Sequence, residues 1–215
     1  MAHRSKVWIV LIYLAALSAW GEVGTQRSLN IYVYNQAKVA DGVLSQAEGN
    51  ATRIFRFSGV QAIWVNCSTS KIEATNCTGL PHSGDVIVQI VHETRILKDD
   101  VFGAAFIGTD GTGQYADVYV DRVNQLHRDW NVSLANVLAH IMAHEIGHLL
   151  LGLNSHSSSG IMRGVWEADE LKAAERGRLL FSREQSKSIQ DRLNAISARR
   201  DLRTVSELAS TRPGS

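Results

Sequence analysis

A length of 215 residues favours one folded domain, with room for a processing segment and a tail. The composition is 45% hydrophobic and 20% charged, which provides ample apolar content for one core. Because 22 basic and 21 acidic side chains leave a formal charge of +1, composition gives no reason to expect a nucleic-acid or membrane-surface partner. The functional interpretation therefore depends on motifs.

The N-terminus has the features of a signal peptide. A basic start that contains Arg4 and Lys6 precedes an apolar run at residues 7–17. The small residues Ala19 and Gly21 fit the minus-three and minus-one positions of a cleavage site, which predicts cleavage after Gly21. The alternative is a membrane anchor, but this run is well short of the roughly 20 residues that span a bilayer. We therefore expect a secreted or periplasmic protein with no stable membrane association after signal removal.

Three strands and a helix are predicted next along the chain. Residues 29–34 (LNIYVY), 60–65 (VQAIWV) and 85–91 (DVIVQIV) favour strands by their β-branched and aromatic content. Between the first two, apolar residues recur at helical spacing across residues 44–57, which predicts an amphipathic helix. A strand, a helix and a strand of these lengths indicate a crossover between parallel neighbours.

The two cysteines, Cys67 and Cys77, flank a polar loop after the second predicted strand. An even count in an oxidising compartment predicts one disulfide, which would stabilise the fold by roughly 2–3 kcal/mol in the chain-entropy model. The alternative is that one cysteine binds a metal as thiolate. The disulfide is favoured because the two cysteines can pair with each other without a further partner and because they flank a loop.

A hairpin is predicted after the third strand. Residues 101–107 (VFGAAFI) form a short apolar run, which the glycine-rich residues 108–113 (GTDGTG) close as a turn before a strand at 115–120. The run and the strand could pair, which would make one member of the sheet antiparallel. The glycine-rich segment lacks the lysine and the following helix of a phosphate-binding loop, so we interpret it as a turn.

The C-terminal half begins with a predicted helix. Its start lies within residues 129–133, with Ser133 or Asn131 as the cap, and an apolar stripe continues from Leu134 into a histidine motif. After Met162 the chain is mixed and charged, which predicts a surface loop or a short helix.

Ser182 and Gln185 match a capping box, which predicts a last helix from Ser182 to about Arg199. The polar residues beyond it predict a flexible tail. There is no internal repeat and no linker between two cores. We therefore expect a signal peptide at 1–21, one domain at 22–200 and a flexible tail at 201–215.

The histidine motif is H-E-x-x-H, formed by His144, Glu145 and His148. Residues four apart on a helix lie on one face, so the two imidazoles can bind a single metal ion. A glutamate directly after the first histidine can reach a water on that metal. Gly152 offers a place for the helix to end, and His156 lies where a returning chain could provide a third ligand.

Three protein ligands with an open fourth position form the catalytic zinc arrangement. One Zn²⁺ at such a site would lower the pKa of its water from 15.7 toward about 7 and polarise a scissile carbonyl. Glu145 would then accept the proton of the water and pass it to the leaving amine. The predicted chemistry is peptide-bond hydrolysis.

The stretch resembles the metzincins, the clan of zinc endopeptidases that includes the matrixins, whose motif is H-E-x-x-H-x-x-G-x-x-H followed by a turn with a methionine. The resemblance implies that His144, His148 and His156 are zinc ligands and Glu145 is the general base. Gly152 would be the turn glycine, and Met162, in SGIM, the Met-turn residue. It also implies an α/β (α+β) fold with a mixed, mostly parallel twisted sheet, an antiparallel edge strand, an active-site helix and a C-terminal helix.

The spacing departs from that family pattern. The glycine comes four residues after His148 instead of three, and the last histidine eight instead of six. If His156 cannot reach the metal, Asn154 stands at the family's ligand spacing, although an amide is a poor zinc ligand. A second clan, the gluzincins, shares only HExxH and takes its third ligand from a downstream glutamate, for which Glu167 or Glu170 is available.

Other residues have less specific interpretations. His140 stands one turn before His144 and is interpreted as a packing histidine. The alternative is that it contacts a metal ligand without binding the metal itself. Trp166 is interpreted as packing. Residues 101–107 could hold an extended peptide by strand addition, or could be plain core.

The function predicted from these residues is a small, secreted, monomeric zinc endopeptidase that acts on peptide or protein substrates. The alternative is a catalytically silent, zinc-stabilised binding module on a protease-like scaffold. An absence of a long propeptide before the first strand would favour the binding module, whereas Glu145 favours the enzyme because no structural role requires a glutamate there.

Overall fold

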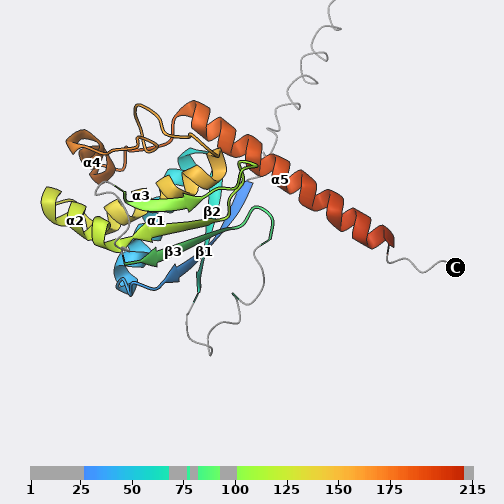
Figure 1. Ribbon diagram of the computed structural model, residues 1–215, viewed down its shortest axis with the longest axis horizontal. Coiled ribbons are helices and arrows are strands. Elements are labelled where there is room, and N and C mark those ends of the chain that lie inside the picture. The colour runs from blue at the N-terminus through green and yellow to red at the C-terminus, as the bar shows by residue number, and fades with distance from the viewer. Residues whose placement is uncertain (1–26, 68–76, 78–81, 93–100, 211–215) are drawn as a thin grey trace, which may run out of the picture.

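The computed structural model describes residues 27–67, 77, 82–92 and 101–210, with side chains described through residue 202. The predicted signal peptide and its cleavage position lie outside the described residues. The described residues contain one mixed sheet of five strands and five helices (Figure 1).

The sheet has the strand order β2-β1-β3-β5-β4. Its first four members are parallel, and β4 at the edge is antiparallel to β5. This confirms the predicted mixed, mostly parallel sheet, including the crossover and the hairpin. The strands are β1 (Arg27–Asn35), β2 (Val60–Cys67), β3 (Val86–Val91), β4 (Gly103–Phe106) and β5 (Tyr115–Tyr119).

The core lies between the sheet and two helices, α1 (Asp41–Phe57) and α3 (Leu134–Leu151). These helices pack against each other and lie across one face of the sheet (Figure 1). Alternate residues of β1, such as Leu29 and Ile31, are fully buried, as period-two patterning requires for a strand with one face in the core. The sheet therefore acts as a rigid floor beneath α3, the helix of the histidine motif.

Helix α3 is apolar around nearly its whole circumference, and 78% of its residues are buried in the protein. Within the described part of the chain it is the one helix long and apolar enough to span a membrane by composition, but a buried core helix meets the same criterion. Its start is capped by Ser133, whose hydroxyl accepts a hydrogen bond from the Asn136 N–H at 3.4 Å.

Three further helices surround this core: α2 (Val120–Trp130), α4 (Ala168–Glu175) and α5 (Arg183–Ser210). The sequence did not predict α2, because its segment is polar and only Val120 and Val123 are buried. Asn131, in a left-handed conformation with φ of 50°, ends α2 and directs the chain into α3. For the charged segment after Met162, the sequence predicted a surface loop or a short helix, and the structure has the short helix α4 there.

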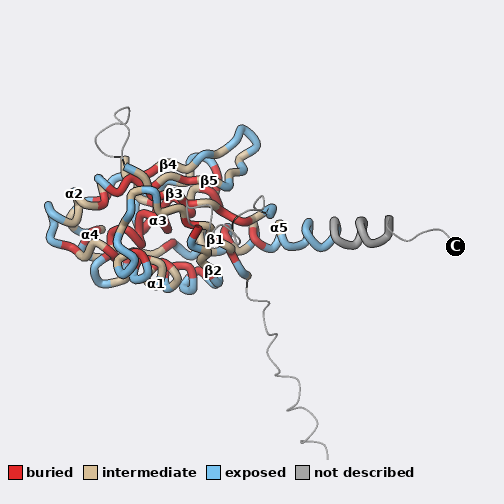
Figure 2. Tube along the Cα trace, turned by 90° about the horizontal axis from the view of Figure 1, so that it is seen from below, coloured by how far each residue is buried: buried red, intermediate tan, exposed pale blue. Residues whose placement is uncertain are grey.

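Helix α5 continues to Ser210, well beyond the predicted end near Arg199, so the expected flexible tail is helical through Ser210. The extension has a physical basis, because residues 200–210 are mostly good helix formers and contain neither glycine nor proline. The helix projects from the body of the protein, and its described outer residues are exposed (Figure 2).

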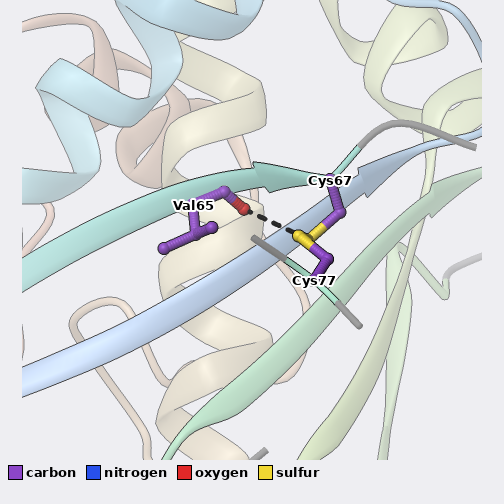
Figure 3. Close-up of a disulfide and its surroundings, with 3 residues drawn as sticks. All are labelled: Val65, Cys67 and Cys77. Atoms are coloured by element: carbon purple, nitrogen blue, oxygen red, sulfur yellow. Dashed lines mark hydrogen bonds between the residues drawn. A yellow bond between two sulfur atoms is a disulfide. The ribbon is translucent and has the colours of Figure 1, made fainter. Parts of the chain in front are cut away.

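Cys67 and Cys77 form the predicted disulfide at the end of β2 (Figure 3). The Cys67 sulfur lies 3.6 Å from the carbonyl oxygen of Val65. These are the two cysteines of the chain, so neither is free to bind a metal as thiolate. That alternative interpretation of the cysteines is therefore wrong.

Candidate metal centre

Three imidazoles converge at the C-terminal end of α3. The Nε2 atom of His148 lies 3.0 Å from that of His144 and 3.1 Å from that of His156. The ligand atoms of all three lie within 4.8 Å of one another. Tetrahedral zinc with bonds of about 2.0–2.1 Å places nitrogen ligands about 3.3 Å apart, so this spacing suits a single zinc ion.

Hydrogen bonds orient two of the rings toward the common point. The Nδ1 atom of His144 lies 2.7 Å from the carbonyl oxygen of Ile161, which can only accept, so Nδ1 carries the proton and Nε2 the lone pair. The Nδ1 atom of His148 lies 2.7 Å from the Ser155 hydroxyl. Outer partners of this kind hold the plane of metal-binding histidines, and the carbonyl partner also fixes the tautomer of His144.

Burial also keeps these two histidines neutral. Desolvation, opposed by the hydrogen bond to Ile161, lowers the pKa of His144 to about 4. Desolvation and the neighbouring imidazoles His144 and His156 lower the pKa of His148 to about 3. Neutral imidazoles are the form that binds metal, and Nε2 atoms 3.0 Å apart are close enough to bind one cation between them. The donor set therefore fits zinc.

Glu145 is buried beside this cluster. Glu145 is 4% exposed. Desolvation raises the pKa of Glu145 to about 8, and the negative charge of Asp117 makes a smaller contribution in the same direction. Strand β4 presses closely on it, because a Cβ atom added at Gly103 would lie 2.7 Å from the Glu145 Cγ atom. The edge strand and the glutamate therefore face each other without an intervening side chain.

The turn after α3 brings His156 to the other two histidines. Gly152 ends the helix with φ of 85°, a conformation that favours glycine, and its N–H donates to the His148 carbonyl at 2.8 Å. Asn154 is also left-handed, with φ of 56°. The helix runs to Leu151, and these two left-handed residues turn the longer connection back, so the stretched spacing still places His156 in the cluster.

Met162 lies fully buried next to this part of α3. A Cβ atom at Gly147, between the two helical histidines, would lie 2.6 Å from the Met162 sulfur. The Ser157 N–H donates to the Met162 carbonyl at 2.8 Å, which closes the loop that follows His156. Met162 therefore lies on a tight loop packed against the helix that carries His144 and His148.

The downstream glutamates are engaged elsewhere. Arg163 pairs with Glu170 at 2.7 Å and with Glu167 at 3.1 Å, and both glutamates form the capping box of α4. Among the described residues, the potential metal-binding cluster contains His156 and neither glutamate. The geometry favours His156 as the third ligand.

His140 is not part of the cluster. Its Nδ1 atom lies 2.7 Å from the Asn136 carbonyl, and its buried Nε2 atom has no hydrogen-bond partner among the described residues. It lines a separate cavity together with Arg53 and Glu175.

Trp166 has a role in the centre that its position in the sequence does not reveal. Its indole ring lies edge-on to His144, with centroids 5.8 Å apart. Its Nε1–H donates at 3.3 Å to the Ile161 carbonyl, the same oxygen that accepts from His144. The contact depends on how the loop after Met162 packs against α3, so spacing in the sequence does not identify it.

The cluster opens into a cleft of about 350 Å³. One wall consists of β4 and its flanking residues, and the other consists of the turn from Gly152 to His156. Glu145 and the three histidines line its floor. The cleft thus places a candidate metal, a buried carboxylate and an edge strand next to one another.

No protein-family model and no curated protein matches the sequence. Among solved structures, the chain is similar to archaemetzincin from Methanopyrus kandleri, with a TM-score of 0.46 and 17% sequence identity. The similarity covers 80% of this chain and 97% of that chain. A similarity this low assigns no activity, which has to be argued from the residues of the cleft.

Proposed function

We propose that this protein is a zinc-dependent endopeptidase, exported from the cell, that acts on peptide or protein substrates. The observation that carries the proposal is the convergence of His144, His148 and His156 beside a buried Glu145 in an open cleft. The disulfide between Cys67 and Cys77 supports an extracytoplasmic location, where such bonds persist. We further propose a metzincin-type, matrixin-like site with one zinc ion and a monomeric protein.

The chain's own residues would divide the chemistry between them. His144, His148 and His156 would hold the zinc ion, which would supply Lewis acidity toward a scissile carbonyl and a water. Glu145 would accept the proton of that water and deliver it to the leaving amine. Burial alone raises the pKa of Glu145 to about 8 and favours its protonated form, whereas a cation on the three histidines would favour the ionised carboxylate that this role requires.

Strand β4 would position the substrate. It lies at the edge of the sheet, where it pairs with β5, and its residues line the cleft directly above Glu145. An extended peptide can bind such an edge by main-chain hydrogen bonds, which would hold a scissile carbonyl next to the three histidines. Positioning of this kind removes a large part of the barrier to a reaction.

Glu145→Gln tests the proposal. The substitution keeps the size of the side chain and removes the proton acceptor, so we expect zinc content to stay at wild-type level and cleavage of a peptide library to fall by at least about 100-fold. Glu48→Gln, on α1 outside the cleft, is the matched control and should cleave like wild type. Metal analysis and a mass-spectrometric cleavage assay provide both measurements.

The same experiment separates the enzyme from a silent binding module. A binding module would hold zinc and show no chelator-sensitive cleavage in the wild type. Undiminished cleavage by Glu145→Gln would contradict the assigned mechanism.

A further inference from the structure

A second cavity, of about 140 Å³, lies between helices α1, α3 and α4, and it shares no described lining residue with the cleft of the three histidines. Helix α1 contributes Asn50 and Arg53 to its lining. Helix α3 contributes Asn136 and His140, which stand four residues apart on one face. The end of α4 contributes Glu175 and the residues that follow it. The cavity is thus a separate site on the helix that carries the histidine motif.

His140 is the buried polar group of this cavity. It is 1% exposed, and its Nδ1 atom lies 2.7 Å from the Asn136 carbonyl oxygen. A carbonyl oxygen can only accept, so Nδ1 carries the proton and Nε2 the lone pair. Desolvation lowers the pKa of His140, which keeps the ring neutral. The buried Nε2 atom has no hydrogen-bond partner among the described residues, so a ligand that donates a hydrogen bond would satisfy it.

Opposite charges stand at the exposed rim of the cavity. The Arg53 guanidinium lies over the turn after α4, because a Cβ atom at Gly177 would lie 3.1 Å from its Nη2 atom. Beside the larger effect of desolvation, the charge of Arg53 lowers the pKa of His140 and that of Glu175 raises it, so both charges are within electrostatic reach of the ring. The Glu175 carboxylate is held in place, since its Oε2 atom accepts from the Asn136 side-chain amide at 3.2 Å.

Apolar side chains complete the lining. They are Ile54, Phe57 and Leu180, of which Phe57 is 65% exposed. A cavity of roughly 150 Å³ is large enough for a molecule the size of benzene, so a cavity of this size limits the ligand to a small molecule. Such a ligand would meet a cation, a carboxylate, a buried hydrogen-bond acceptor and some apolar surface.

We propose that this cavity binds a small zwitterion, an α-amino acid with a short aliphatic side chain. Its ammonium group would donate to the His140 Nε2 atom and pair with Glu175, and its carboxylate would accept from the planar fork of the Arg53 guanidinium. A simple anion would leave Glu175 without a partner and the His140 lone pair without a donor. A simple amine would leave Arg53 unmatched. The site is distinct from the cleft and does not depend on the proposed peptidase function.

Calorimetric titration of the zinc-loaded full chain with L-valine tests this proposal. Isovalerate keeps the side chain and the carboxylate of valine without its ammonium group, and isobutylamine keeps the ammonium group without the carboxylate. We expect each analogue to bind at least about tenfold more weakly than valine, because each loses hydrogen bonds to a charged group. The ¹⁵N signal of the His140 Nε2 atom, assigned by its absence in His140→Phe, should shift on titration with valine. An isovalerate affinity equal to that of valine would reveal a plain anion site and overturn the proposal.

Variants of the rim show where valine binds. Arg53→Met and Glu175→Gln should each weaken valine binding at least about tenfold. Arg56→Met changes another exposed arginine of α1, one that does not line the cavity, and should bind valine like wild type. A thermal melt of each variant checks its folding. Valine held by the zinc ion instead would bind Arg53→Met as tightly as wild type, and that result, or no measurable binding at the highest soluble valine concentration, overturns the proposal.

Discussion

At the scale of single residues, burial acts in opposite directions on neighbouring groups of α3. It lowers the pKa of His144 and His148 and so keeps them neutral, while it raises the pKa of Glu145 and favours its protonated form. Both effects disfavour charge in a buried site. A divalent cation reverses the balance, because it binds neutral imidazoles and attracts the carboxylate.

This balance predicts a pH-dependent stability of the chelator-treated protein. The pKa of Glu145 is about 8 in the folded state against 4.5 as its ordinary value, so its contribution to stability is fully present below about pH 4.5 and is lost as pH rises through 8. Urea unfolding of wild type and Glu145→Gln in chelator should therefore diverge in favour of the variant between pH 5 and 8.5. Both proteins contain the same histidines, so the comparison isolates the contribution of Glu145.

Parallel pH profiles for the two proteins would show that Glu145 is not held protonated by its surroundings. With zinc present, the difference in stability between wild type and Glu145→Gln should become smaller, because the cation stabilises the ionised carboxylate.

At the scale of elements, the structure depends on a close contact between β4 and α3. A Cβ atom at Gly103 would lie 2.5 Å from the Asp117 carbonyl oxygen and 2.7 Å from Glu145, so any larger residue must displace backbone. The contact sets the depth of the cleft at the position where the substrate would bind.

Gly103→Ala should therefore destabilise the protein by about 1–3 kcal/mol, the usual cost of overpacking. Gly49→Ala is the matched control, because its Cβ atom would meet nothing within 4 Å and alanine favours the interior of α1 by about 1 kcal/mol. Urea denaturation measures both effects. Equal stability of Gly103→Ala and wild type would mean that the strand and the helix move apart at no cost.

The elements also show what could be predicted from the sequence. Strands β1, β2 and β3 follow from runs rich in β-branched and aromatic residues, and helices α1 and α3 follow from apolar residues at helical spacing. The antiparallel edge follows from a short apolar run and a glycine-rich turn that leads into β5. Helix α2 buries two valines and therefore left too weak a pattern. The predicted end of α5 came too early because the outer part of the helix is polar, although about half of its residues are good helix formers and none is glycine or proline.

Part of the candidate site could likewise be predicted from the sequence, and part could not. The HExxH residues are four apart on one helix, so local geometry alone brings His144 and His148 together. The approach of His156 depends on the backbone of a turn with two left-handed residues, and the place of Trp166 depends on the loop after Met162. Contacts set by tertiary packing of this kind leave no periodic signal in a sequence.

At the scale of the whole molecule, one core supports one cleft. The sheet and α1 surround α3, and the cleft opens where the C-terminal end of α3 meets the edge strand β4. Helix α5 packs on the core through Ile189 and Leu193 and then leaves the body of the protein (Figure 1). The candidate chemistry is therefore confined to one rim of the fold, with a rigid interior behind it.

Peptide cleavage should depend on one zinc ion held by the three histidines. Chelator-stripped protein should regain cleavage in proportion to added zinc and saturate at one equivalent, because the cluster offers one site. His156→Ala should stay inactive at one equivalent and bind zinc more weakly. Cleavage that persists without metal would show that the reaction needs no zinc, and a His156→Ala variant that reconstitutes like wild type would show that His156 is not a ligand.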